Sequence, residues 1–322
     1  MLTYENLRLL KRLPYTIYWV GFGALYLGLE ELVFKALHSP VFPVTRLVLT
    51  FAIISGIPVA ATYAQRSFGT VLASFGSITS VSRDDYYNWA TRTMASTFSF
   101  RNWHTILVFF LIDILVMATL FSVPFPFHGA VITAVVLLLQ PFCLLAAHAV
   151  AVVTGLMNAL ARMSSMPLDV PFLRPGAIAV SPLMAFYGRV SFIALLIFAA
   201  HYLSFAVGGF AMAKPILIWT ALIGFFPFAL LVFSFTQAHG LLGRIKEVHL
   251  EGINTEVQAA MSRFRLDPSK QKAEVLEALT RLQRQVEQTK DWPVNVESFG
   301  YLVAALAAPV AQLMVALPNG SR

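Results

Sequence analysis

The sequence predicts an all-α, polytopic membrane protein with six or seven transmembrane helices and a cytoplasmic helical hairpin. Of its 322 residues, 58% are hydrophobic and only 12% are charged, against about 25% charged in a typical soluble domain. Several apolar runs reach the roughly 20 residues that cross a bilayer, and a later polar segment has apolar positions at helical spacing. This composition excludes an ordinary soluble enzyme and a disordered chain. The single cysteine, Cys143, excludes a disulfide framework.

Six apolar runs form a predicted transmembrane domain over residues 1–236. The runs lie at about 13–29, 44–64, 105–123, 131–157, 190–213 and 215–236. A seventh run, 298–317, is also long enough to cross the bilayer but is rich in alanine. Residues 297–322 are therefore a C-terminal hydrophobic segment that either inserts into the membrane or spans it.

Basic residues in the short loops predict the orientation, because Lys and Arg in such loops stay on the cytoplasmic side. One side has ten: Arg8, Lys11, Arg12, Arg66, Arg83, Arg92, Arg101, Arg162, Arg174 and Arg189. The other side has Lys35, Arg46 and Lys214. The N-terminus is therefore expected in the cytoplasm, with the chain as a multi-pass protein of a cell or inner membrane. The net charge of +7 mainly reflects these loops, so no nucleic-acid partner is expected.

Three features recur along the transmembrane domain at intervals of roughly 86 residues. Odd-numbered spans follow a basic residue, and even-numbered spans contain a proline and end near a glycine. The matching positions are Arg12, Arg101 and Arg189; Pro58, Pro141 and Pro227; and Gly69, Gly155 and Gly240. Three helical hairpins would give this pattern, and internal repeats are common in transporters. Coincidence among six similar spans is the alternative.

The segment after the second span has one apolar face at helical spacing, formed by Phe68, Val71, Leu72, Phe75 and Ile78. Such a face predicts an amphipathic helix lying on the bilayer surface. A capping-box pattern follows, in which a serine precedes an aspartate by three residues at 82–85. It predicts that a second helix begins there and runs through about residue 92.

Residues 237–296 are the soluble-looking part of the chain and predict a cytoplasmic helical hairpin. Two apolar stripes have spacings of three and four residues, one at Ile253, Val257, Ala260 and Phe264, the other at Val275, Leu279, Leu282 and Val286. Between them, Asp267 and Pro268 suit the N-cap and the first position of the second helix. We expect the two stripes to face each other.

Four polar residues within the predicted spans are candidates for a polar pathway. By position along their spans, Asp113, Gln140 and His201 are expected near the bilayer midplane, and His148 one step nearer the cytoplasm. Ionisable groups at this depth are costly and often mark ion or proton routes, and histidine changes charge near neutral pH. The alternative is a hydrogen bond between Asp113 and His201 that only holds two helices together.

An outer charged group lies beyond the first span and before the second. Glu30 and Glu31, with Lys35 and Arg46 nearby, predict either an outer vestibule for cations or a solvated loop with local ion pairs.

Enzyme chemistry has little support. The sequence has no HExxH, GxSxG or Walker-type motif, and its seven histidines include no pair at three- or four-residue spacing. The spacing points to no cofactor or metal.

The sequence is therefore compatible with two functions. The first is a channel- or transporter-like subunit for a small ion or solute. The alternative is a non-catalytic membrane scaffold whose hairpin docks a cytoplasmic partner through 241–296. Assembly into a homo-oligomer is compatible with either function.

Overall fold

The computed structural model describes residues 13–36, 44–100, 102–122, 129–168, 182–183, 185–197 and 214–288. Seven of its helices are α1 (Tyr15–Ala36), α2 (Val44–Phe75), α3 (Arg83–Phe98), α4 (Trp103–Ser122), α5 (Gly129–Ser165), α7 (Lys214–Leu266) and α8 (Lys270–Glu287). A shorter apolar helix covers Ala185–Ile197. The prediction of an all-α protein is confirmed for this part of the chain. The last apolar run, 298–317, lies outside the described residues.

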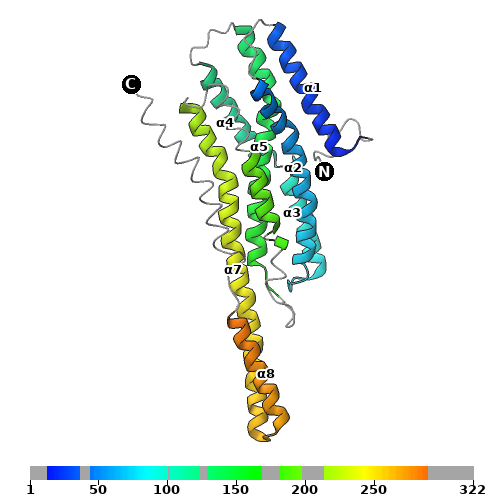
Figure 1. Cartoon of the computed structure of the whole chain (residues 1–322), viewed down its shortest axis with the longest axis vertical. Helices are drawn as coiled ribbons and strands as arrows, with labels where there is room; N and C mark the ends of the chain where they lie inside the picture. The colour runs from blue at the N-terminus through cyan, green and yellow to red at the C-terminus, as the bar shows by residue number, and fades with distance from the viewer. Residues whose placement is uncertain are drawn as a thin grey trace.

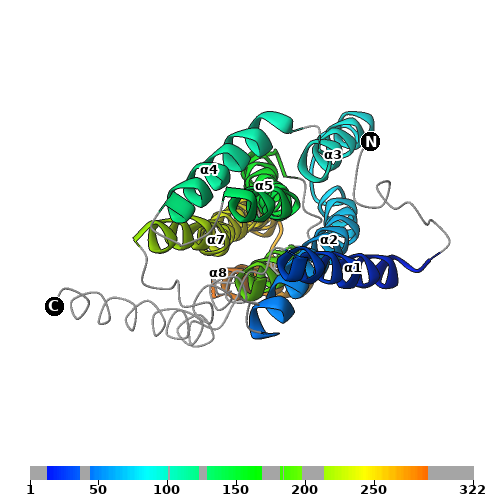
Figure 2. The same ribbon diagram turned by 90° about the horizontal axis from the view of Figure 1, so that it is seen from above.

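The helices lie roughly along one long axis, with α5 at the centre (Figures 1 and 2). α5 packs against α1, α2, α3, α4 and α7. α7 has 53 residues and projects beyond the other long helices, and α8 folds back along its projecting end (Figure 1). At 1.5 Å per residue, α7 is about 80 Å long. We call the end with α8 the hairpin end and the opposite end the distal end.

The apolar face at Phe68 does not form a separate surface helix, so this prediction is wrong. α2 continues as one helix from Val44 to Phe75, and its apolar face is buried against α3, α5 and the helix Ala185–Ile197. The exposed fraction of Phe68 is 0%, and that of Phe75 is 2%. An amphipathic helix can bury its apolar face against lipid or against other helices, and here neighbouring helices cover this face.

The second helix of this region begins where the capping pattern predicts. Ser82 is the N-cap of α3, and its hydroxyl accepts a hydrogen bond from the Asp85 backbone N–H at 3.2 Å. The same hydroxyl donates to Asp85 Oδ2 at 2.6 Å. The first of these bonds satisfies one of the N–H groups that a helix N-terminus leaves without a partner. The helix then runs to Phe98, six residues beyond the predicted end.

The main apolar core lies in the half of the molecule nearer the hairpin end. It joins α2, α3, α5, the helix Ala185–Ile197 and α7 through side chains such as Phe98, Leu156, Tyr187 and Leu230. Each is at most 2% exposed, and burying an apolar side chain of this size contributes about 1.5–3 kcal/mol. A smaller cluster at Trp19, Ile54 and Leu145 joins α1, α2 and α5.

Large apolar side chains are exposed on four helices toward the distal end. They are Ile17, Leu25, Leu29 and Leu32 of α1; Leu107, Val108, Leu111 and Leu115 of α4; Phe192 and Leu196; and Phe225 and Phe228 of α7. Within the described residues, two helical stretches are long and apolar enough to cross a membrane, Cys143–Ser165 and Phe228–Leu266. Their mean hydropathies are 1.9 and 1.2. Both features agree with association with a membrane.

Candidate functional site

Two of the four predicted pathway residues lie on adjacent helices, Asp113 on α4 and Gln140 on α5. The structure describes their backbone but not their side chains. α4 and α5 run in opposite directions, and Ile106 of α4 is clustered with Ala147 and Ala151 of α5. Asp113 is seven residues after Ile106 along α4, and Gln140 is seven residues before Ala147 along α5. Their backbones therefore lie at nearly the same level between the two ends.

His148 is buried, with 1% of its surface exposed. Its imidazole stacks on the ring of Phe100, with 4.1 Å between ring centroids and 24° between ring planes. It is eight residues along α5 from Gln140, or about 12 Å. His148 thus occupies a separate level nearer the hairpin end. His201, the fourth predicted pathway residue, lies outside the described residues.

Glu30 and Glu31 are in different environments although they are neighbours in sequence. Glu31 forms a 2.7 Å ion pair with Lys35 one turn along α1, as a solvated group with local ion pairs would. Glu30 is only 6% exposed. The solvated interpretation is therefore wrong for Glu30, whose direction on the helix differs by about 100° from that of Glu31.

Arg46 is on α2, and the pairing of α1 with α2 places its backbone near the level of Glu30. Ser55 Oγ donates to the Trp19 carbonyl at 3.1 Å, and Tyr15 Oη donates to the Pro58 carbonyl at 2.8 Å. The two helices are thus antiparallel, and extending this register toward the distal end brings Glu30 opposite the start of α2 at residue 44, two positions from Arg46. The side chain of Arg46 is not described.

The same two helices share a polar contact that the sequence analysis did not identify. Tyr15 Oη, which donates to the Pro58 carbonyl, also accepts a 2.5 Å hydrogen bond from Thr62 Oγ1. A tyrosine at the start of an apolar helix is usually assigned to the membrane interface, so no sequence signal revealed this contact. It fixes the entry of α1 against the middle of α2.

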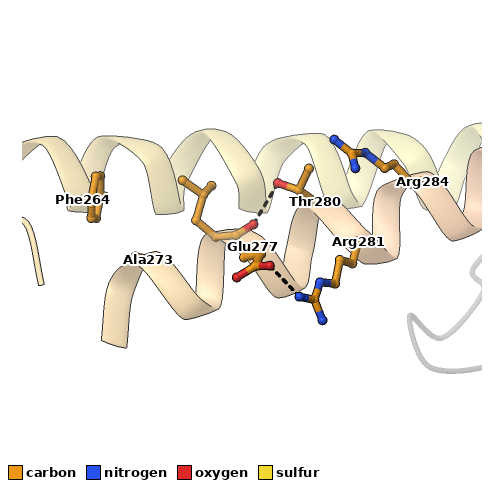
Figure 3. A pocket seen from close by; sticks show the side chains of 7 residues that line it. Phe264, Ala273, Glu277, Thr280, Arg281 and Arg284 are labelled. Carbon is orange, nitrogen blue, oxygen red and sulfur yellow. Dashed lines mark hydrogen bonds and ion pairs between the residues drawn. The ribbon is translucent and has the colours of Figure 1, made fainter. Parts of the chain in front are cut away.

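At the hairpin end, α7 and α8 enclose a groove of about 420 Å³ (Figure 3). It is lined by Phe264, Ala273, Leu276, Glu277, Thr280, Arg281 and Arg284. Arg281 and Glu277 form a 2.5 Å ion pair beside it. The groove therefore combines an apolar floor with charged edges.

The predicted hairpin is present, but two of its details are wrong. Val275, expected in the seam, is 51% exposed, while Leu276 lines the groove. The N-cap of α8 is Ser269, whose hydroxyl accepts from the Lys272 N–H. Asp267 instead binds Lys272 Nζ at 2.6 Å, so its carboxylate is drawn to an ammonium group rather than to the helix N–H groups.

The described residues contain no group of three His, Cys, Asp or Glu side chains arranged to hold a metal ion. No family model matches the chain, and no curated protein or solved structure is similar to it.

Proposed function

We propose that the chain is a multi-pass integral membrane protein with six transmembrane helices and a cytoplasmic hairpin end, and that it conducts or transports a small cation. The apolar side chains exposed on α1, α4, the helix Ala185–Ile197 and α7 support the membrane part of this proposal. Soluble monomers rarely expose so extensive an apolar surface. In a bilayer these side chains would face lipid.

The observation that carries the transport proposal is the buried carboxyl group of Glu30. It lies on a helix whose neighbouring side chains, Leu29 and Leu32, are 53% and 67% exposed and apolar. Placing an ionisable group at membrane depth costs about 2.5–3.5 kcal/mol on insertion scales, so such residues are rare and usually functional. Elsewhere in the bundle, Asp113 and Gln140 share one level, and His148 lies about 12 Å nearer the hairpin end.

This series of levels favours a cation over an anion. Two of the groups are carboxyls on separate helices, and α5 lies between those helices (Figure 2). A carboxylate attracts a cation by charge, and amide and imidazole groups can bind it through lone pairs. Protons are included in this class, since carboxyl and imidazole chains relay protons in known pumps.

A flux assay with neighbouring glutamates tests the proposal. Purified protein in liposomes should carry a cation or proton flux that falls at least about tenfold with Glu30→Gln or Asp113→Asn. Glu31→Gln is the matched control and should leave the flux unchanged, because Glu31 is in an ion pair on the helix surface. The absence of any flux, or a flux insensitive to Glu30, Asp113 and His201, would refute the transport function.

A second function, a scaffold that docks a cytoplasmic partner, is favoured by the hairpin groove. α8 has apolar residues along one face but no fully buried residue, so α7 covers that face incompletely. Affinity capture with the wild type and with Leu276→Glu tests this function. A partner that is retained by Val275→Glu and lost with Leu276→Glu would support it, whereas identical partners for all three proteins would count against it.

A further inference from the structure

A second hollow, of about 560 Å³, lies between α3 and the end of α5. Residues lining it include Asp85, Asn88, Trp89, Arg92 and Ser96 of α3 and Arg162 of α5. Arg92 and Arg162 are 70 positions apart in the sequence and come together only through the packing of α3 on α5. Arg162 is three residues from the end of the apolar stretch Cys143–Ser165. The hollow is therefore at the hairpin-end boundary of the apolar region.

The two arginines are available for a ligand. Both are exposed, and within the described residues neither guanidinium has a hydrogen bond or ion pair. The carboxylate in the lining, that of Asp85, accepts a hydrogen bond from the Ser82 hydroxyl. Two cations that line one hollow repel each other, and an anion between them removes that cost.

Hydrogen-bond donors dominate the rest of the lining. Asn88 has an amide NH₂, and Thr91 and Thr93 have hydroxyl groups. The Ser96 hydroxyl already donates to the Thr93 carbonyl at 3.1 Å. A guanidinium presents its N–H groups in a planar fork that matches two oxygens of a phosphate group. Asp85 offers an acceptor at the same hollow, which suits a hydroxyl group on the same ligand.

We propose that this hollow binds the phosphate group of a hydroxylated phosphate ester through Arg92 and Arg162. The phosphate belongs either to a lipid headgroup at the membrane boundary or to a soluble metabolite. The proposal is independent of cation transport, because it uses none of the residues of that pathway.

Two arms of one experiment distinguish these sources, both with the full-length protein in a neutral detergent. In the soluble arm, glycerol phosphate is titrated by calorimetry. In the lipid arm, native mass spectrometry compares retention of phosphatidylglycerol with retention of phosphatidylcholine. Each arm uses the wild type, Arg92→Gln, Arg162→Gln and the control Arg83→Gln. Arg83 carries the same charge on α3 but does not line the hollow.

We expect Arg92→Gln and Arg162→Gln each to weaken binding about tenfold or more in one arm, since each removes a charge-assisted contact. Arg83→Gln should bind as the wild type does. An effect confined to the first arm identifies a soluble ester, and one confined to the second identifies a lipid headgroup. The proposal is overturned if neither ligand binds, or if Arg83→Gln weakens binding as much as the other two. Circular dichroism spectra and melting temperatures of all four proteins show whether each variant is folded.

Discussion

At the scale of single residues, Gly23 determines how closely α1 and α2 approach. A Cβ atom at this position would lie 2.2 Å from Ser55 Oγ and 2.9 Å from a ring carbon of Phe51. Real Cβ contacts are not this short, so the helices must separate or the side chains must move. Small residues permit this kind of close packing between membrane helices.

We therefore expect Gly23→Ala to lower the free energy of unfolding by about 1–3 kcal/mol, as overpacking generally does. Gly21→Ala and Gly28→Ala are matched controls on the same helix, because a Cβ at either position has no neighbour within 4 Å. Unfolding in mixed micelles measures the difference. Equal effects at all three glycines would contradict the close approach at Gly23.

Tyr86 makes a buried contact in the half of the bundle nearer the hairpin end. Its hydroxyl donates to the Leu72 carbonyl at 2.6 Å, and burial raises the pKa of Tyr86 above its usual range. The folded protein thus keeps the phenol proton at a pH where the unfolded chain, with a pKa of about 10, loses it. Unfolding then releases a proton, so the free energy of unfolding falls as the pH rises above about 10.

We expect Tyr86→Phe to cost about 1 kcal/mol at neutral pH, because it removes one buried hydrogen bond. The difference between wild type and variant should shrink above pH about 10. Tyr87→Phe is the control, since Tyr87 is 70% exposed. Denaturant titrations at neutral and alkaline pH supply the measurement, and a pH-independent difference would argue against burial of the Tyr86 phenol.

The two glutamates at 30 and 31 illustrate what sequence can reveal at this scale. Charge and position identified the pair as candidates, and the spacing of Glu31 and Lys35 suited an ion pair within one turn. Which of the two is buried depends on where α1 contacts its neighbours. That contact involves residues far away in the sequence, so local pattern does not determine it.

At the scale of elements, the end of α5 is held by a side chain from α7. The guanidinium of Arg244 donates to the carbonyls of Ser164 and Met166, the latter at 2.9 Å. Ser164 in turn donates its hydroxyl to Gln237 Oε1 at 2.6 Å. The last carbonyls of a helix lack partners within it and attract positive charge. Arg244 therefore acts as a cap that joins two helices.

Arg244→Ala should lower the free energy of unfolding by about 1–3 kcal/mol, because it leaves these carbonyls without a charged donor. It should also speed hydrogen exchange of the amides near Met166, while exchange at α1 stays the same. Arg263→Ala, an exposed arginine further along α7, should have neither effect. Unchanged exchange at the end of α5 would rule out the capping role.

The helices themselves were largely predictable, because their apolar periodicity is a local property. The hairpin was expected from its two stripes, and the start of α3 from Ser82. The continuation of α2 to Phe75 was not predicted, because an amphipathic face indicates burial without indicating what covers it. The start of α8 was misplaced by two residues because Asp267 and Ser269 both suit an N-cap, and Lys272 Nζ engages the former.

At the scale of the whole molecule, the two ends differ in the side chains that they expose. Leu111 and Leu25 are 54% and 76% exposed toward the distal end, whereas exposed residues on the projecting part of α7, such as Glu251, are often polar. Composition predicted association with a membrane, and the exposed apolar side chains agree with that prediction. Composition did not predict that Arg92 and Arg162 line the same hollow, because only the packing of α3 on α5 brings them there.

Spin labels on single cysteines test whether the distal end contacts lipid and the hairpin end contacts water. Because Cys143 is the only cysteine, a Cys143→Ala background allows Leu111→Cys and Glu251→Cys to be labelled separately. In vesicles, a spin label at 111 should be relaxed by oxygen, which dissolves in lipid, and one at 251 by a water-soluble nickel complex. A label at 111 that responds mainly to nickel would contradict the membrane placement.

The uninterrupted length of α7 also fixes a distance. From Thr236, the last residue of the predicted span, to Leu266 there are 30 residues of continuous helix, or about 45 Å. In the proposed membrane placement, a rod of this length would hold the groove clear of the headgroup layer, which is only several ångströms thick on each side. A docked protein could thus be as large as a typical globular domain without touching lipid. Removing whole turns of helix from this rod would shorten that clearance in steps of about 5.4 Å.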